Sequence, residues 1–309
     1  MAVYIAGSIN LDIITSLDRL PVPGETVLAR ATAKLPGGKG ANQAVAAARM
    51  GAETRMIGAV GEGDAGRWMC ERLAAEGIDV SGVSVLSGHE TGTAYIAVDA
   101  QGENQIIVVS GANAQLSGVE PVSGGVLLSQ LEVPVAALLP VFAQSKAIRI
   151  LNTAPALAEA RCLFEHVDIL VLNQHELAVY TQASDGDDIL ARARSLLTRS
   201  GQAVVVTLGG DGALAVRGDW HFHVPAVPVV PVDTIGAGDC FCGSLAALLD
   251  EGYCLAEALP KASAAAALST LGQGAAPSMP SRAAVEDLLS GAATEHAPPV
   301  KNPRAAALS

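Results

Sequence analysis

One glycine-rich stretch joins a carboxylate to backbone amides that could hold an anion. It reads Asp233-Thr-Ile-Gly-Ala-Gly-Asp239, and small apolar residues at helical spacing follow it. Gly236, Ala237 and Gly238 allow a tight turn with unshielded N–H groups, and a helix start leaves such groups free for an anion. Asp239 could remove a hydroxyl proton while these amides hold the charge of a transferring phosphoryl group. The stretch indicates phosphoryl transfer to an alcohol, and an N-cap carboxylate after a flexible turn is the structural alternative.

A second glycine-rich stretch, Pro36-Gly-Gly-Lys-Gly-Ala-Asn42, opens an alanine-rich helix. Its glycines permit close backbone approach, and Lys39 and Asn42 place polar side chains at the helix start. The pattern suits a polyhydroxylated or anionic ligand. It differs from a Walker A loop because Lys39 is followed by glycine. A tight turn with a surface lysine is the alternative.

Polar side chains also follow two expected strands. Asn10 and Asp12 are alternate residues after the first strand, so in extended geometry they share a face. Glu132 follows the apolar run at 125–128. Ligands of parallel sheets bind beyond the carboxyl ends of the strands, where a carboxamide and carboxylates could hold sugar hydroxyls. Ordinary turn polarity would explain the same residues.

Two further motifs could serve a nucleotide. Asn173 and Glu176 follow the expected strand at 169–172 and share a face of a helix start, where they could bind phosphate oxygens and the water shell of Mg²⁺. A capping arrangement is equally compatible with this spacing. Thr207-Leu-Gly-Gly-Asp-Gly212 ends a strand in a turn that could line a nucleotide or simply form a hairpin.

Two other patterns are weaker. Gly61-Glu-Gly-Asp-Ala-Gly66 fits GxGxxG, but it lies in the wrong strand–helix unit, and the acids after it come sooner than the ~20 residues typical of a dinucleotide site. His221 and His223 would face one side of a strand, yet no third ligand is spaced with them, so a satisfied pair of histidines is favoured over a metal site.

Strand and helix patterns alternate along the chain, which predicts an α/β fold with a mostly parallel sheet between two helical layers. Two pieces, residues 11–33 and 91–109, break the alternation, and we expect them to form a small β-sheet beside one large domain. Residues 292–309 are expected to form a flexible tail. The expected strands are 3–8, 55–60, 125–128, 149–152, 169–172 and 203–208, with 227–232 as a strand or its approach; the expected helices are 40–50, 65–76, 135–145, 189–199, 241–249, 255–270 and 282–289.

Composition narrows the classes of function. The 309 residues are 50% hydrophobic with a net charge of −12, which argues against a nucleic-acid or anionic-membrane partner. The five cysteines form no CxxC pair, which is typical of reduced cytosolic thiols. The start of the chain resembles no signal peptide, and no apolar run is of membrane-spanning length. These features predict a soluble cytoplasmic protein.

The motifs, in this order, resemble the ribokinase (PfkB) family of sugar kinases over residues 3–289. Gly58-Ala-Val-Gly-Glu-Gly-Asp64 is similar to the family's first signature, and residues 233–243 are similar to its highly specific second one. The stretches at 7–12, 37–49, 102–104 and 130–132 look most like the ribokinase branch. Two departures, Ser263 in place of a larger polar residue and Asp211 in place of a lysine, put the nucleotide preference in doubt.

The resemblance implies a kinase that transfers phosphate from ATP to the O5 hydroxyl of D-ribose, with a β-sheet lid that pairs with a second subunit's lid. It also implies Mg²⁺ and an activating K⁺. Asp239 would be the base and Gly236, Ala237 and Gly238 the anion hole. The implied contacts are Asn10, Asp12, Gly38, Lys39, Gly40, Asn42 and Glu132 for the sugar; Asn173, Glu176 (through Mg²⁺ and its waters), Thr207, Gly209, Gly212, Gly238 and Ser263 for the nucleotide; and Asp233, the Ile235 carbonyl, Ser269, Gly272, Gly274 and Ser278 for K⁺.

Other functions stay open on the sequence. The substrate could be another pentose, deoxyribose or a nucleoside, because one hydroxyl in a hydrogen-bonding site can change specificity greatly. A non-catalytic sugar- or nucleotide-binding regulator is a different class, and the intact Asp239 and its glycines argue against it. A nicotinamide oxidoreductase would depend on the GxGxxG turn alone.

Overall fold

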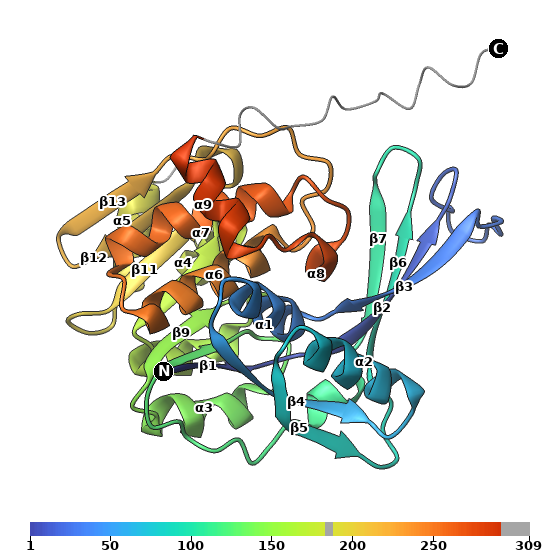
Figure 1. Ribbon diagram of the computed structural model, residues 1–309, viewed down its shortest axis with the longest axis horizontal. Helices are drawn as coiled ribbons and strands as arrows, with labels where there is room; N and C mark the ends of the chain where they lie inside the picture. The colour runs from blue at the N-terminus through green and yellow to red at the C-terminus, as the bar shows by residue number, and fades with distance from the viewer. Residues whose placement is uncertain (183–187, 292–309) are drawn as a thin grey trace.

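A nine-stranded sheet runs through the protein, whose computed structural model describes residues 1–182 and 188–291. The strand order is β13-β12-β11-β10-β9-β8-β1-β4-β5 (Figure 1). Neighbours from β11 to β5 run parallel, and β12 and β13 are antiparallel additions at one edge. The expected mostly parallel sheet is confirmed. The strands are β1 (Ala2–Ala6), β4 (Glu53–Gly61), β5 (Asp79–Leu86), β8 (Val126–Ser129), β9 (Ile148–Asn152), β10 (Ile169–Asn173), β11 (Ala203–Thr207), β12 (Ala213–Arg217) and β13 (Trp220–Val224).

Helices cover both faces of this sheet, because its central strands are apolar on both sides. One core contains Val3 and Ile5 of β1 with side chains of α1, α2, α6, α7 and α9. The other contains Leu127 of β8 with side chains of α3, α4 and α5. The helices are α1 (Lys39–Arg49), α2 (Asp64–Ala75), α3 (Val135–Gln144), α4 (Gln174–Thr181), α5 (Ile189–Ser195), α6 (Ala237–Glu251), α7 (Leu255–Ser269), α8 (Ala275–Ser278) and α9 (Arg282–Ser290). In the described part of the chain, no helix has the length and apolarity needed to cross a membrane.

A separate four-stranded sheet projects from one side of the molecule (Figure 1). Its order is β3-β2-β6-β7, formed by β3 (Ala31–Gly37), β2 (Asn10–Ser16), β6 (Gly92–Val98) and β7 (Asn104–Val109). β6 and β7 pair antiparallel, so the predicted hairpin is confirmed. The small sheet starts at Asn10 and includes Gly37, and both ends therefore lead directly into the two motifs with polar side chains.

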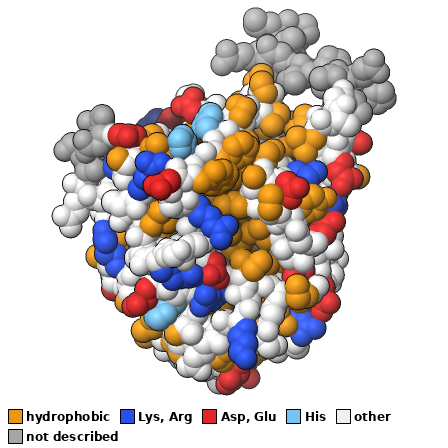
Figure 2. Space-filling view, turned by 90° about the vertical axis from the view of Figure 1, so that its left-hand side faces the viewer, with side chains coloured by type: hydrophobic (Ala, Val, Ile, Leu, Met, Phe, Trp, Pro, Cys, Tyr) orange, Lys and Arg blue, Asp and Glu red, His pale blue; other side chains and the backbone are white. Residues whose placement is uncertain are grey.

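Two of the strand predictions differ from the structure. Residues 227–232 form no strand, because Pro228 and Pro231 lack the N–H groups that a ladder needs. The segment exposes Val230 and Val232, and hydrophobic side chains gather in a band on the side of the molecule that carries β12 and β13 (Figure 2). β5 was not expected, since its side chains are exposed or half-buried and form no apolar run. The expected tail at 292–309 lies outside the described residues.

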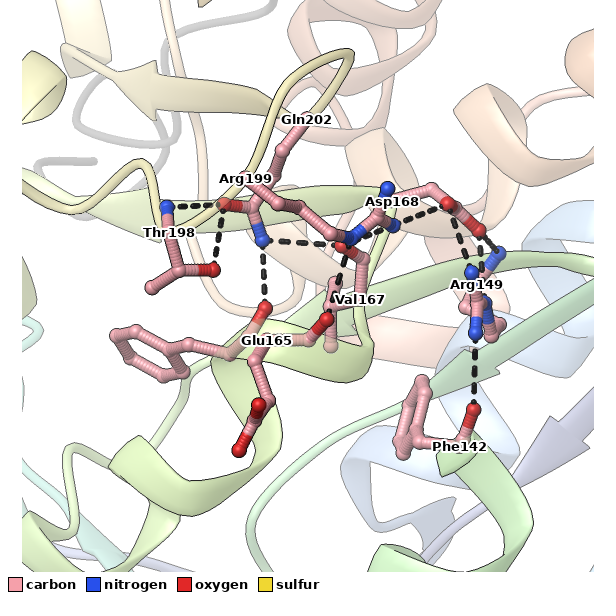
Figure 3. Close-up of polar contacts among 9 residues, drawn as sticks. Phe142, Arg149, Glu165, Val167, Asp168, Thr198, Arg199 and Gln202 are labelled. Carbon is pink, nitrogen blue, oxygen red and sulfur yellow. Dashed lines mark hydrogen bonds and ion pairs between the residues drawn. The ribbon is translucent and has the colours of Figure 1, made fainter. Parts of the chain in front are cut away.

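A polar cluster ties the amino ends of β9, β10 and β11 together (Figure 3). Asp168 accepts hydrogen bonds from Arg149 (Nε at 2.9 Å, Nη2 at 3.0 Å) and from Arg199. Burial alone would raise the pKa of Asp168, but these hydrogen bonds outweigh it and lower that pKa. Beside them the buried Gln202 donates to the carbonyls of Phe164 and Val167. The cluster secures the sheet end opposite to the motifs described next.

Candidate active site

The glycine turn before α6 places Asp239 in the first turn of that helix. Gly236 has φ 79°, a left-handed conformation that favours glycine, and a Cβ there would lie 2.6 Å from the Cβ of Ala275. The first helical bond joins the Cys240 N–H to the Gly236 carbonyl at 2.8 Å. The earlier N–H groups have no acceptor within the helix. The Ala237 N–H donates to the Thr234 carbonyl at a long 3.3 Å, so this amide of the predicted anion hole already makes a weak bond.

Asp239 meets two amides of α1, about two hundred residues earlier in the chain. Asn42 Nδ2 donates to Oδ2 at 3.0 Å, and Gln43 Nε2 donates to Oδ1 at 2.9 Å. The helices approach closely because Gly243 of α6 has no side chain; a Cβ there would lie 2.3 Å from the Gln43 carbonyl oxygen. The two glycine-rich motifs therefore form one site.

Burial dominates the titration of this carboxylate. Asp239 is 7% exposed, and desolvation raises its pKa, while Lys39 and the hydrogen bonds from Gln43 and Asn42 act in the opposite direction. Free N–H groups at a helix start would be expected to keep such a carboxylate ionised at neutral pH. Instead, its hydrogen bonds come from side chains of α1, and burial outweighs them. A carboxyl group with a raised pKa is suited to act as a base near neutral pH.

Lys39 and Glu132 lie next to Asp239. Gly38 has φ 88° and turns the chain so that α1 begins at Lys39, whose N–H donates to Glu132 Oε2 at 3.2 Å. Ser8 Oγ donates to the same oxygen at 2.5 Å. The charge of Asp239, and less strongly that of Glu132, raises the pKa of Lys39 against the effect of burial. Lys39 thus carries a positive charge that interacts with both carboxylates.

The start of the small sheet completes this polar group. The Asp12 carboxylate lies over Gly37, where a Cβ would come within 2.2 Å of Oδ1. Asn10 Oδ1 accepts a hydrogen bond from Asn113 Nδ2 at 2.7 Å. Burial, Glu132 and Asp239, in that order, raise the pKa of Asp12 to about 7. The structure therefore brings the predicted sugar residues Asn10, Asp12, Lys39, Asn42 and Glu132 together around Asp239.

The raised pKa of Asp12 makes the stability of the free protein depend on pH. The folded protein keeps a proton that the unfolded chain releases between pH 3.8 and about 7, so this stabilisation is complete at low pH and is lost as the pH rises through about 7. From about pH 5.5 to 7.5 the wild type should lose about 1–2 kcal/mol of unfolding free energy relative to Asp12→Asn. Urea titrations of both proteins measure this difference, and parallel pH profiles would contradict it.

Two cavities meet beside Asp239. The larger has a volume of about 550 Å³ and is lined by the turn after β11, the segment before α6 and α7. The smaller, about 130 Å³, contains Lys39, Asn173, Glu176 and Asp239. Thr207 and Gly238 line both. Of the predicted nucleotide residues, Gly209, Gly212 and Ser263 line the larger cavity, and residues 226–229 and Pro231 form its apolar wall.

Asn173 and Glu176 adopt the capping arrangement that the sequence left open. Asn173 Oδ1 accepts from the Glu176 N–H at 2.8 Å, and the Glu176 carboxylate accepts from the N–H and the Nδ2 of Asn173. Burial raises the pKa of Glu176. Because both residues also line the smaller cavity, the cap fixes a carboxylate at its wall without excluding a role towards a ligand.

Some of the residues implied for a monovalent cation contact one another, and Ser269 bonds within its own helix instead. Asp233 Oδ1 accepts from the Ile235 N–H and Oδ2 from the Gly274 N–H, both at 2.9 Å, so Asp233 ties the glycine turn to the segment after α7. Gly272 lies against Ser278, whose hydroxyl donates to the Gly274 carbonyl at 2.6 Å. Ser269 donates to Ala266 within its own helix.

The two histidines of β13 do not build a metal site. Within the described residues no group of three or more His, Cys, Asp or Glu side chains could hold a metal ion. His223 Nε2 instead makes a 2.9 Å hydrogen bond with the Asp211 carbonyl in the turn after β11. His223 thus has the hydrogen-bond partner that the preferred interpretation expects, and the turn forms the hairpin between β11 and β12 that the sequence left as one alternative.

Five buried polar residues of the site escaped the sequence analysis. Their side chains bond to the predicted residues or to one another, and Asn152 also lines the smaller cavity. The only available signal was position, since Gln43 follows Asn42 directly and the others lie at or just after the ends of strands or in a short 3₁₀ helix. They are Ser8, Gln43, Asn113, Gln130 and Asn152.

Known proteins share both the sequence and the fold. The profile described as "pfkB family carbohydrate kinase" matches residues 2–282. The ribokinase of Bacillus subtilis is 36% identical, with 93% of this chain and 99% of the relative covered. The deoxyribokinase of Salmonella typhi is 35% identical, with 91% and 96% covered. The chain spans 56% of the bifunctional ribokinase/ribose-5-phosphate isomerase A of Fructilactobacillus sanfranciscensis, at 34% identity and 93% of this chain.

A solved structure of Arabidopsis thaliana ribokinase complexed with ribose and ATP matches with a TM-score of 0.84 at 32% identity, covering 94% of this chain and 99% of that one. The large parallel sheet, the small separate sheet and the turn before α6 define a ribokinase-like α/β fold. The chain belongs to the pfkB family of carbohydrate kinases. It is therefore a sugar kinase, a phosphotransferase with an alcohol group as acceptor.

Proposed function

We propose that the protein transfers the terminal phosphoryl group of ATP to the O5 hydroxyl of D-ribose. One observation carries the proposal: the buried Asp239 lies between a cluster of polar residues suited to sugar hydroxyls and the cavities that reach its glycine turn. The similarity to ribokinases over almost the whole chain supports ribose as the acceptor. A coupled assay of ADP release with ribose tests the proposal.

In the proposed complex, ribose lies between the small sheet and the large domain. Asp12 and Glu132 accept hydrogen bonds from sugar hydroxyls, and Lys39 and Asn42 donate to them. Gly38 and Gly40 let the backbone approach. A Cβ on Gly40 would come within 2.7 Å of the Gly7 and Ser8 backbone, so this part of the site depends on a bare chain.

The reaction needs one proton acceptor and several donors. Asp239 accepts the O5 proton while the oxygen attacks the terminal phosphorus of ATP, and the bond from that phosphorus to ADP breaks. The products are ribose 5-phosphate, ADP and the proton on Asp239. The N–H groups of Gly236, Ala237 and Gly238 face the charge that develops on the transferring group, with the positive end of α6 behind them. Lys39 compensates the negative charge nearby.

ATP would occupy the 550 Å³ cavity, whose volume suits a small-molecule ligand. Its base would lie against the apolar wall formed by Val227 and Val229, with Ser263 on α7 as a polar contact. The phosphates would then point past Thr207 towards Gly238, which both cavities share. Mg²⁺ would neutralise phosphate charge, and the free lone pairs of Glu176 suit contacts to its water shell.

K⁺ activation is a further part of this proposal, since Asp233 places a carboxylate between the glycine turn and the segment after α7, and hard cations prefer oxygen ligands. A bound K⁺ would fix the turn that carries the anion hole, so we expect a several-fold higher kcat in K⁺ than in tetramethylammonium at matched ionic strength. Replacing Asp233 would remove its hydrogen bonds to the Ile235 and Gly274 N–H groups whether or not a cation binds. Changing the cation in the buffer is therefore a cleaner test than mutating Asp233. Equal rates in both salts would contradict cation activation.

We also propose that the small sheet is a lid and that two lids pair in a dimer. Ile106, Ile107, Val108 and Val109 of the edge strand β7 are each 47–66% exposed, and an exposed apolar edge of this kind favours pairing with another chain. Light scattering should give the mass of two chains. Ile107→Lys should shift it towards one chain, whereas Val85→Lys, an exposed valine on β5, should not. A wild-type mass of one chain would contradict the pairing.

A second acceptor is favoured by a specific observation. The deoxyribokinase relative is about as similar as the ribokinases, so 2-deoxyribose is the main competing substrate. Comparing kcat/KM for ribose, 2-deoxyribose, other pentoses and nucleosides decides between them, and a preference for 2-deoxyribose would replace ribose in the proposal.

We propose the cytoplasm as the compartment of the protein, because all five cysteines are unpaired. Localisation of a tagged chain in its host would test this.

A further inference from the structure

A chain of buried amides lies behind the proposed base. Gln43 and Gln130 are fully buried, and Asn152 is 9% exposed. They come from three elements, α1, the end of β8 and the end of β9. Buried amides need hydrogen-bond partners, and here most of those partners are one another. The chain ends on Asp239.

Each link has a defined direction. Gln130 Nε2 donates to Gln43 Oε1 at 2.5 Å. Gln43 Nε2 then donates both to Asp239 Oδ1 at 2.9 Å and to Asn152 Oδ1 at 3.1 Å. Asn152 is itself oriented, because its Nδ2 donates to the Val171 carbonyl at 3.3 Å.

An ionised Asp239, and an Asn152 amide held by the Val171 carbonyl, favour this orientation of the Gln43 amide. Gln130 Nε2 completes it, while its own Oε1 has no hydrogen-bond partner among the described residues. If it were reversed, its oxygen would face the Asp239 carboxylate and the Asn152 oxygen, while its NH₂ would face that of Gln130. Three acceptors would then oppose one another, and so would the two NH₂ groups, in a buried space, which is strongly unfavourable. Gln130 thereby acts on Asp239 without touching it.

We propose that Gln43, held in orientation by Gln130, is a positioning residue that aims the Asp239 carboxylate and favours its ionised form. The inference rests on the proposed function, since it assigns Gln43 a role only if Asp239 is the base. A donated hydrogen bond stabilises a carboxylate but not the acid, so losing the donor should make Asp239 harder to ionise. Burial, which already raises the pKa of Asp239, increases the importance of each remaining donor.

Other ionisable groups also face Asp239, and they stay in place when Gln43 is changed. Lys39 favours the ionised carboxylate, and the acidic groups oppose it. None of them donates to Oδ1 in the place of Gln43. The groups are Lys39 of α1, Asp12 of β2, Glu132 after β8, Glu176 of α4, and the Cys240 and Cys242 thiols of α6.

The test is the pH profile of kcat at saturating ribose and Mg-ATP. A base must be ionised to work, so kcat falls as the pH drops below its pKa. In Gln43→Met, which keeps the length of the side chain but removes the donor, this acid limb should move up by about one pH unit. Below the limb kcat should then be about tenfold lower than in the wild type, while the alkaline plateau and the KM for ATP stay within about threefold.

Two further variants make the result specific. Gln130→Met leaves Gln43 in place but removes the donor that orients it, so its limb should move in the same direction by less. If Gln43→Met does not fold, the acid limb of Gln130→Met tests the positioning role in its place. Gln202→Met is the matched control, since Gln202 is equally buried, donates to the Phe164 and Val167 carbonyls and lies at the opposite end of the sheet (Figure 3). It should lower Tm and leave the limb unmoved.

The outcomes separate the inference from the function beneath it. An unmoved limb in Gln43→Met, with only a lower plateau or Tm, overturns the positioning role, and so does an equal shift in Gln202→Met. Where Gln43→Met does not fold, an unmoved limb in Gln130→Met does the same. Measured alongside, an Asp239→Asn variant with near wild-type kcat overturns the proposed function itself.

Discussion

Replacing Asp239 with asparagine should lower kcat by about 10²–10⁴-fold and leave a folded protein that still binds ATP. The amide keeps the shape of the carboxylate but accepts no proton. It offers one oxygen where Asp239 offers two, so either Asn42 or Gln43 loses an acceptor, at about 1 kcal/mol. Removing a buried charge offsets part of that loss, because burial disfavours the ionised carboxylate.

The measurement combines kcat, ATP affinity and Tm for this variant. Asp250→Asn is a suitable control, because Asp250 lies on the same helix with a side chain that is only 7% exposed, and it faces the chain's amino terminus rather than the site. Its kcat should equal that of the wild type. A kcat within a few-fold of wild type for Asp239→Asn would show that this carboxylate is not the base. An unfolded Asp239→Asn protein would show that the residue is structural.

Replacing Asp12 with alanine should lower kcat/KM for ribose by about 5- to 150-fold, equivalent to ~1–3 kcal/mol of lost hydrogen bonding in a buried site. The KM for ATP should stay unchanged, because Asp12 lies on the small sheet and lines neither cavity at the glycine turn. The variant removes a carboxyl group that interacts electrostatically with both Glu132 and Asp239. Loss of sugar use without loss of nucleotide binding is therefore the expected pattern.

The matched control is Asp18→Ala, because Asp18 lies just beyond the same strand with an exposed side chain paired to Arg30. Exposed ion pairs contribute little to stability, so this variant should behave like the wild type. Unchanged ribose kinetics in Asp12→Ala would remove Asp12 from the sugar site. Equal losses of kcat/KM for ribose and for ATP would indicate a general disturbance rather than a lost sugar contact.

Much of the site could be predicted because its residues stand at strand ends and helix starts. Asn10, Asp12 and Glu132 were placed by the rule that parallel sheets bind ligands at their carboxyl edge, and the structure brings them together. Glycine-rich turns marked the starts of α1 and α6 in the same way. Local chemistry and chain geometry were sufficient there.

The rest depended on contacts between distant segments. Gln43 and Gln130 are ordinary amides in the sequence, and only the packing of α1 against α6 through Gly243 gives them a role. The pKa of Asp239 could not be deduced either, because the sequence shows the helix start but not the depth of burial. The strand expected at 227–232 was a different, local error, because the prolines that lack N–H groups are visible in the sequence itself.

Direct detection of the product tests the central claim most sharply. The protein is incubated with Mg-ATP and ¹³C-labelled D-ribose in K⁺, and both ³¹P and ¹³C spectra are recorded. Phosphoryl transfer to O5 predicts one equivalent of ADP for each ribose consumed, with phosphorus coupling to C5 and to no other hydroxyl-bearing carbon. Over the same incubation, the Asp239→Asn protein should form both products at least about 10²-fold more slowly. Phosphorus coupling to C1, C2 or C3, or ADP release that does not depend on ribose, would contradict the account.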